Sequence, residues 1–172
     1  MSKGIFESTN ISGKNLSFVS TVELENGMLV HKGDLIEGSK DVYEALIPTA
    51  STINSQPVYV VGNPAWNYDT SSSVNQNEDN YVIKAGTVFR VYSLKPTDKF
   101  GIADYGINGT PVVGEFVGLQ ANSAKPVAAA TAPGTAFVGK VIQEVDMGHE
   151  YFVGMPVDNR TKKIRIEVVK NG

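Results

Sequence analysis

The residues of this chain that could do acid–base or metal chemistry are few, and the sequence gives them no partners. The two histidines, His31 and His149, stand in the contexts LVHKGD and DMGHE. A catalytic dyad or a metal centre would need a carboxylate or a second ligand beside each ring. Asp34 follows His31 by three residues, but neither context has the spacing of a metal site. We therefore interpret both histidines as exposed or turn residues.

A second candidate is the acidic segment NQNEDN, residues 75–80, which could offer oxygen ligands to calcium. It lacks the alternating ligands, central glycine and closing glutamate of an EF-hand loop, so a solvated loop is the better interpretation. The chain has no cysteine, and it contains no nucleophile-elbow, phosphate-loop or dinucleotide-binding motif. We expect no enzyme activity, no cofactor and no metal site.

The charge pattern argues against nucleic acid and membrane as partners. The 172 residues include 15 basic and 18 acidic side chains, which gives a net charge of −3. The basic segment RTKKIR, residues 160–165, would divide its charges between the two faces of a strand. The N-terminus lacks the apolar core of a signal peptide, and no apolar run approaches the roughly 20 residues of a membrane span. We expect synthesis in the cytoplasm and a protein partner.

The elements that position these residues are short strands, because 17 glycines and 8 prolines interrupt the chain. In KIRIEVV, the apolar Ile164, Ile166 and Val168 alternate with charged residues, which predicts a strand with one face in the core. Similar runs, rich in β-branched and aromatic residues, occupy 16–24, 41–47, 57–61, 81–94, 100–105, 111–119, 136–145, 150–155 and 162–169. This spacing predicts an all-β fold, a compact β-sandwich or β-barrel of many short strands with little helix.

Glycine-containing turns separate these runs. Asn26-Gly27 and Asn108-Gly109 suit the positive φ angles of type I′ turns, and we expect the first pair to close a hairpin. Gly33 in HKGDLI and Gly86 in IKAGTV each stand between short apolar runs. Both are expected to mark a turn or a β-bulge.

The organisation predicted from composition is an N-terminal arm, residues 1–15, followed by a single β-rich domain, residues 16–172. The arm is polar apart from Ile5, Phe6 and Ile11, so it cannot build a core of its own. We expect it to order only against a partner. Deleting residues 2–12 should then leave the stability of the domain nearly unchanged.

Two long loops are predicted within the domain. Residues 62–80 are polar and contain Trp66, the only tryptophan, together with Tyr68. Residues 120–135 are rich in Ala, Pro and Thr. Exposed aromatic side chains are common interface anchors. Trp66 therefore either faces a partner or folds back over an edge of the core, and the sequence leaves both readings open.

The order of several segments resembles that of the small β-rich head proteins of tailed bacteriophages. These segments are ENGMLVHKGDLIEGSKDVYEALIPT, QPVYVVGNPAWNYD, AGTVFRVYSLKPTDKFGIADYGI, TAFVGKVIQEV and IRIEVVKNG. Such proteins decorate, or cement, the outside of an assembled capsid. The resemblance covers most of the chain from about residue 16 and rests on segment order. It offers no counterpart for the Trp66 loop or the Ala-rich stretch.

The resemblance implies a structural protein of the virion exterior that works by contact and has no catalytic residues. It implies the major capsid protein as the partner and makes a homo-oligomer, for example a trimer, plausible. The candidate interface residues are then Ile5, Phe6, Trp66 and Tyr68. One alternative is a β-sandwich module that binds glycans on Trp66 and Tyr68, which glycan titration would reveal. Another is a tail-tube or other virion component, which would polymerise by itself.

Overall fold

The computed structural model describes residues 4–65, 81–146 and 162–172. Within these ranges the chain forms eleven strands and no α-helix, so the all-β prediction is confirmed. No helix in the described part is long and apolar enough to cross a membrane. The elements are β1 Phe6–Asn10, β2 Asn15–Val19, β3 Leu29–Leu35, β4 Val42–Leu46, β5 Tyr59–Val61, β6 Val88–Ser93, β7 Lys99–Ala103, the 3-10 helix η3 Asp104–Gly106, β8 Phe116–Gln120, β9 Ser123–Ala129, β10 Phe137–Asp146 and β11 Lys162–Asn171.

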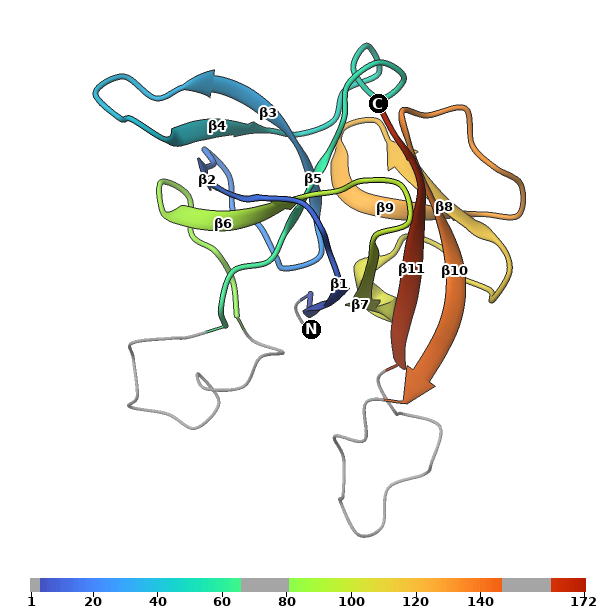
Figure 1. Cartoon of the computed structure of the whole chain (residues 1–172). Coiled ribbons are helices and arrows are strands. Elements are labelled where there is room, and N and C mark those ends of the chain that lie inside the picture. Colours follow the sequence, from blue (N-terminus) through green and yellow to red (C-terminus); the bar gives the residue numbers. More distant parts are fainter. Residues whose placement is uncertain (1–3, 66–80, 147–161) are drawn as a thin grey trace, which may run out of the picture.

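The strands form a closed barrel beside an open sheet. The barrel has the order β2-β4-β3-β5-β6, and β6 pairs with β2 to close it. The second sheet is antiparallel throughout, with the order β1-β7-β11-β10-β8-β9. Figure 1 shows the barrel on the left and the long β10–β11 hairpin of the sheet on the right. Barrel closure removes the exposed edges that five separate strands would otherwise present.

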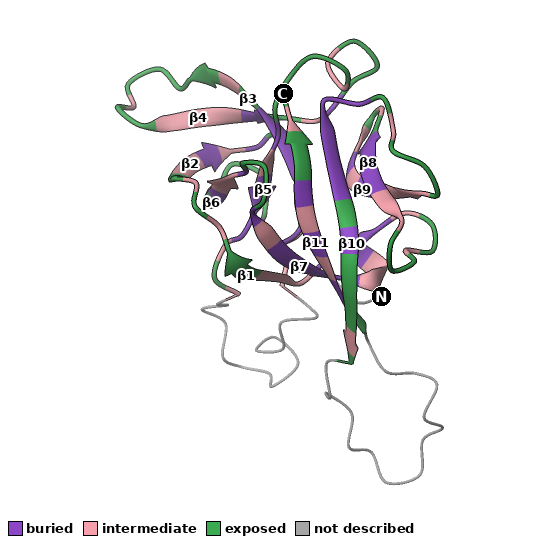
Figure 2. Cartoon of the chain, turned by 45° about the vertical axis from the view of Figure 1, so that its right-hand side comes forward, coloured by how far each residue is buried: buried purple, intermediate pink, exposed green. Residues whose placement is uncertain are grey.

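Strands β3, β5 and β6 separate two hydrophobic cores and contribute side chains to both. We call these three strands the wall. On β3, Leu29 belongs to the core between barrel and sheet, while the next residue, Val30, belongs to the core inside the barrel. Val60 and Val61 divide in the same way on β5. All four side chains are essentially inaccessible to water, and Figure 2 shows the burial along these strands. Because successive residues of a strand point to opposite faces, one strand can place side chains in both cores.

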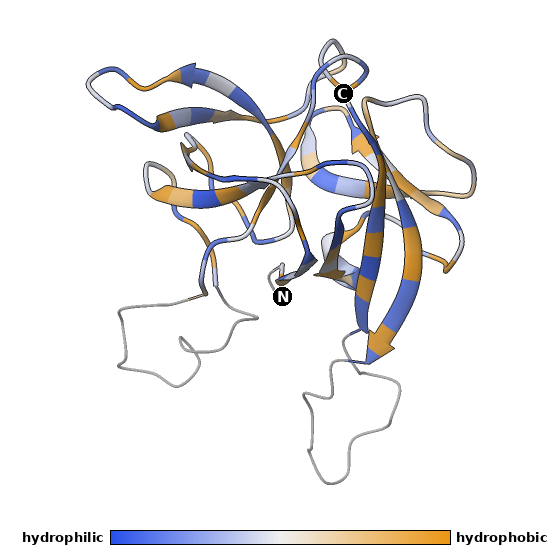
Figure 3. Ribbon diagram, in the orientation of Figure 1, coloured by the Kyte–Doolittle hydropathy of each residue, from blue (hydrophilic) through white to orange (hydrophobic). Residues whose placement is uncertain are grey.

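The open sheet has one apolar and one polar face. On β11, Ile164, Ile166 and Val168 are buried in the core between barrel and sheet, as their alternation predicts. The charged residues between them lie on the outer face. Figure 3 shows this alternation of hydropathy along β11.

The N-terminal segment differs from its prediction. Residues 6–10 form strand β1, which pairs with β7 of the same chain, with Phe6 opposite Ile102. The Phe6 ring packs against the rings of Tyr92 and Phe100, at centroid separations of 5.4 and 6.2 Å. The expectation that this segment orders only against a partner is therefore wrong. The packing of the Phe6 ring and the pairing with the edge of β7 contribute to its placement.

The Ala-rich stretch also differs from its prediction. Residues 123–129 form β9, which pairs with β8, so the predicted loop over 120–135 contains a strand. Ala124 is buried in the barrel core. Small side chains are weak strand formers, but they allow β9 to lie close to the barrel. The other predicted loop is described only as far as residue 65, and residues 66–80 lie outside the described part.

The Asn-Gly turns have a different geometry from the predicted one. Gly27 has a φ of +85°, whereas Asn26 is not among the described residues with positive φ, so the turn is not type I′. It also closes no hairpin, because Leu24 pairs with Ile83 rather than with β3. Gly109, with a φ of +90°, lies at a bend after an isolated bridge to β9.

The two glycines predicted to mark turns or bulges are confirmed. The pairing of β3 with β4 shifts register between Lys32 and Leu35, which surround Gly33. Gly86 has a φ of +77° and lies in a turn that precedes β6.

Substitution of Gly62 tests whether β1 is an integral part of the fold. A Cβ at this position would lie 2.5 Å from the Phe6 ring and 2.6 Å from the Tyr92 ring. Gly62→Ala should therefore lower the free energy of unfolding by about 1–3 kcal/mol, the usual cost of overpacking. The measurement is denaturant unfolding followed by circular dichroism. Gly134→Ala is the matched control, because apart from its two chain neighbours no residue has an atom within 4 Å of the added Cβ. Equal stability of the two variants would contradict the packing of Phe6 described above.

Candidate functional site

Two of the four predicted interface residues, Ile5 and Phe6, are tied to the fold. The Ile5 carbonyl accepts a hydrogen bond from the amide of Ala103 at 3.3 Å. Both side chains are half-buried, and they line a cavity of about 270 Å³ together with Tyr92 and Pro64. The parts of Ile5 and Phe6 that remain accessible line this cavity, and their contact with a partner stays a prediction.

The other two predicted interface residues, Trp66 and Tyr68, lie outside the described residues. The structure does describe the polar network on either side of their segment. Asn26 and Asn63 exchange two hydrogen bonds of 2.9 Å, and the Asn63 side-chain amide also donates to the Tyr81 hydroxyl. Asn63 precedes the segment and Tyr81 follows it, so these bonds hold its two ends together. Whether Trp66 and Tyr68 contact a partner stays a prediction.

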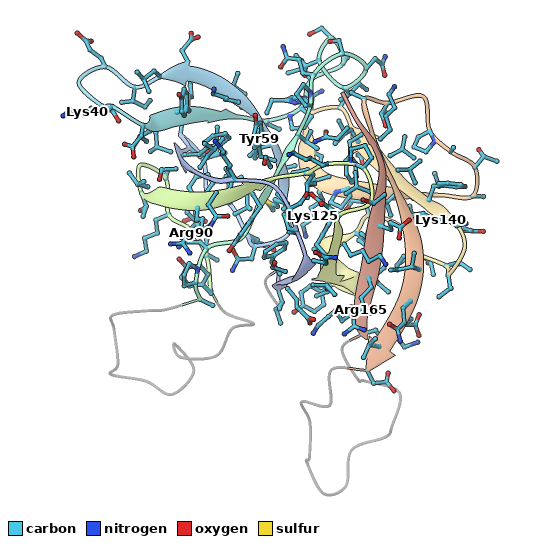
Figure 4. The ribbon with its side chains drawn as sticks, viewed as in Figure 1. Lys40, Tyr59, Arg90, Lys125, Lys140 and Arg165 are labelled. Carbon is cyan, nitrogen blue, oxygen red and sulfur yellow. The ribbon has the colours of Figure 1, made fainter. Side chains whose placement is uncertain are left out.

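An ion cluster fastens β1 across the outer face of the sheet. Glu7 on β1 pairs with Lys163 and, at 3.7 Å, with Arg165 on β11, although β7 lies between them. Gly101 makes this reach possible, because a Cβ there would lie 2.9 Å from the Lys163 side chain. Arg165, labelled in Figure 4, also donates to the Gln143 side chain at 2.8 Å.

The electrostatics of this cluster depend on Glu7. Burial lowers the pKa of the Lys163 ammonium, and repulsion from Arg165 lowers that pKa further. The Glu7 carboxylate carries the opposite charge and contacts both cations. Without Glu7, two cations would face each other on a partly buried surface.

An exposed apolar pair lies at the end of the β3–β4 hairpin. Leu35 is 47% exposed and Ile36 is 36% exposed, and we call them the hairpin patch. The turn that follows is held by its own hydrogen bonds, including Ile36 N–H to the Val42 carbonyl at 2.9 Å. Leu35 lies opposite Tyr43, whose ring carries the Lys32 ammonium 3.9 Å from its centroid. The patch therefore sits on a defined surface.

A second group of exposed apolar residues lies in the segment before β8 and on β10. It consists of Val112, Val113 and Ile142, and we call it the bulge patch. The Gly114 amide donates to the Val141 carbonyl at 2.8 Å, which brings the two valines next to β10. Ile142 is the unpaired residue of a β-bulge, and bulges commonly turn a side chain outward. Neither patch was predicted from the sequence. Apolar residues close to Gly38 and Gly114 could have indicated exposed apolar side chains beside turns.

His31 is buried, which corrects its interpretation as an exposed or turn residue. It lies on β3 and is 1% exposed, and its Nδ1 is 2.9 Å from the Pro57 carbonyl oxygen. Since a carbonyl can only accept, Nδ1 carries the proton in this bond. Nε2 has no hydrogen-bond partner among the described residues. His149 lies outside them.

No group of three or more histidine, cysteine or acidic side chains in the described part could hold a metal ion. The described arrangement offers contact surfaces and supporting ion pairs.

The chain matches no known protein family, no curated protein and no solved structure.

Glu7→Gln tests the ion cluster. The neutral amide cannot compensate Lys163 and Arg165, so the free energy of unfolding should fall by about 1 kcal/mol at low salt. High salt should reduce this loss, because it screens the remaining repulsion. Urea unfolding at both salt concentrations measures the effect. Glu144→Gln is the control, since its partner Lys162 is exposed and 2.7 Å away, and it should change stability little. A Glu7→Gln variant as stable as the native chain would show that the cluster does not fasten β1.

Proposed function

We propose that this chain is a non-enzymatic structural protein of a tailed-phage virion that binds the outside of the capsid. The observation that supports this proposal is the presence of two separate exposed apolar patches on one β-rich body. The resemblance in segment order supplies the class of partner, the major capsid protein. The location is then the capsid exterior, reached after synthesis in the host cytoplasm.

The two patches lie on different sides of the molecule. The β3–β4 hairpin projects from the barrel on the left of Figure 1, whereas β8 and β10 lie on the right. A protein that stabilises a seam must touch two neighbours, and two separated patches suit that task. One of the neighbours could equally be a sister subunit, so a homo-oligomer such as a trimer is part of the proposal.

The hairpin patch has the features of a contact surface. Its apolar side chains are surrounded by charged residues of both signs, and Lys40 marks the tip in Figure 4. An apolar centre with a polar rim is the usual anatomy of a protein interface. Because the turn is fixed by its own hydrogen bonds, binding there would cost little ordering entropy.

The patches together are small relative to a stable interface, which buries about 1,200–2,000 Å² in total. A decoration protein can bind through such patches because it is present in many copies on one surface. Contacts with neighbouring copies then add to the contact with the capsid. Contact with the surrounding polar residues supplies the remaining area.

The test is to add purified protein to phage heads that lack it and to count the bound copies. The double variant Leu35→Asp, Ile36→Asp should keep the native melting temperature and lose most of its binding, because each exposed leucine or isoleucine becomes a buried charge at the interface. Val22→Asp is the matched control, since Val22 is also exposed but lies in neither patch. It should bind as the native chain does.

Three results would count against this proposal. Native protein that does not bind heads would exclude capsid decoration. Binding that is unchanged in the double variant would exclude the hairpin patch as a contact. Protein that polymerises alone into tubes would favour a tail component instead.

A further inference from the structure

The chain contains three Asn-Gly pairs, and they lie in different environments. The pairs are Asn26-Gly27, Asn108-Gly109 and Asn171-Gly172. In an Asn-Gly pair, the glycine amide nitrogen can attack the asparagine side chain, because glycine has no Cβ to hinder the approach. The reaction requires the asparagine side chain and the glycine amide to be free to move toward each other. Hydrogen bonds that hold either group should therefore slow it.

Asn26-Gly27 is held at both reacting groups. The Asn26 side chain makes two hydrogen bonds of 2.9 Å with the backbone of Asn63. The Gly27 amide donates to the Val61 carbonyl at 2.8 Å. Both residues are buried, and Ile102 lies within 2.7 Å of the position that a Gly27 Cβ would take.

Asn171-Gly172 is held in a similar way. The Asn171 side chain accepts from the Val58 amide at 2.8 Å, and it donates to the Val58 and Leu94 carbonyls at 3.0 Å each. The Gly172 amide donates to the Ala136 carbonyl at 3.0 Å. Neither reacting group can move without breaking bonds.

Asn108-Gly109 is different. The Asn108 side chain has one hydrogen bond, an exposed contact of 3.0 Å from its Nδ2 to the Gln120 side chain. Gly109 is exposed, and among the described residues its amide has no hydrogen-bond partner. It begins the largely exposed segment 109–114, which is tied to β10 again at Gly114. The peptide that carries the Gly109 amide is held only through the Asn108 carbonyl, which accepts from the Ala128 amide at 2.8 Å, so one hydrogen bond at the edge of the sheet has to break before the glycine amide turns toward the side chain.

We propose that Asn108 is a site of spontaneous deamidation in the folded protein, whereas Asn26 and Asn171 are protected. The Gly109 nitrogen loses its proton to solvent base and bonds to Cγ of Asn108. The bond from Cγ to Nδ2 breaks, Nδ2 takes up a proton, and ammonia leaves. Water then opens the resulting five-membered imide at either carbonyl, which gives aspartate or isoaspartate. No oxidant or reductant takes part.

The modification has a structural consequence at the edge of the sheet. The Asn108 amide donates to the Pro126 carbonyl and its carbonyl accepts from the Ala128 amide, both at 2.8 Å. These two bonds cover the outer side of β9, the edge strand opposite β1. Isoaspartate adds one methylene to the main chain at residue 108, so both bonds cannot keep their lengths. Its formation would uncover part of the β9 edge, and open edges can pair with other chains.

The experiment follows the three sites within one sample of intact protein. The folded protein is kept at mildly alkaline pH and digested at intervals, and mass spectrometry measures conversion at each asparagine. A parallel sample is kept in denaturant, where all three pairs should convert at similar rates. In the folded protein, Asn108 should convert at least about tenfold faster than the other two, because fewer and more exposed hydrogen bonds hold its side chain and the Gly109 amide.

Two further measurements complete the test. Asn108→Ser should remove the fast conversion, which confirms the assignment. In aged native protein, the Ala128 amide should exchange its hydrogen faster than in fresh protein. The proposal is overturned if Asn108 in the folded protein converts no faster than Asn26 or Asn171. Rapid conversion that leaves the exchange of Ala128 unchanged would overturn the predicted loosening of β9.

Discussion

The wall formed by β3, β5 and β6 is the constraint on which the rest of this structure depends. Adjacent residues such as Val60 and Val61 face different cores, one between barrel and sheet and one inside the barrel. Burial of each valine side chain contributes about 1.5–3 kcal/mol to the free energy of unfolding. The same short strands therefore stabilise both cores. A register slip of one residue would exchange the two faces and disturb both cores at once.

Two glycines allow β1 to pack closely against the neighbouring strands. Gly62 leaves room for the Phe6 ring, and Gly101 lets Lys163 reach Glu7 across β7. The N-terminal strand is therefore fastened on both faces of the sheet, by an aromatic contact on the inner face and an ion pair on the outer face. Rigidity of this kind suits a protein whose proposed work is contact.

The sequence predicted the parts of the fold that local patterns determine. Alternation along β11 placed Ile164 and Ile166 in the core, and the glycine spacing placed the bulge at Gly33. It did not predict β1, because FESTN has one large apolar residue and its pairing with β7 spans most of the chain. It did not predict β9, because alanine and proline are poor strand formers and only the neighbouring β8 makes this segment a strand.

The candidate site was predicted less well, for a related reason. Ile5 and Phe6 are apolar residues in a polar segment, which is equally the pattern of an exposed anchor and of an edge strand that inserts one ring. The hairpin and bulge patches arise from turns and a β-bulge, whose outward direction depends on register. His31 was misplaced because its burial depends on the fit between β3 and the segment at Pro57, which no local pattern records.

The central claim is that the shared wall makes barrel and sheet one cooperative body. Differential scanning calorimetry of the native chain, Val60→Ala and Val61→Ala tests it most directly. Our account predicts a single transition whose calorimetric and van't Hoff enthalpies agree, and both variants should lower its temperature without splitting it. Two separate transitions, with each variant shifting a different one, would contradict it.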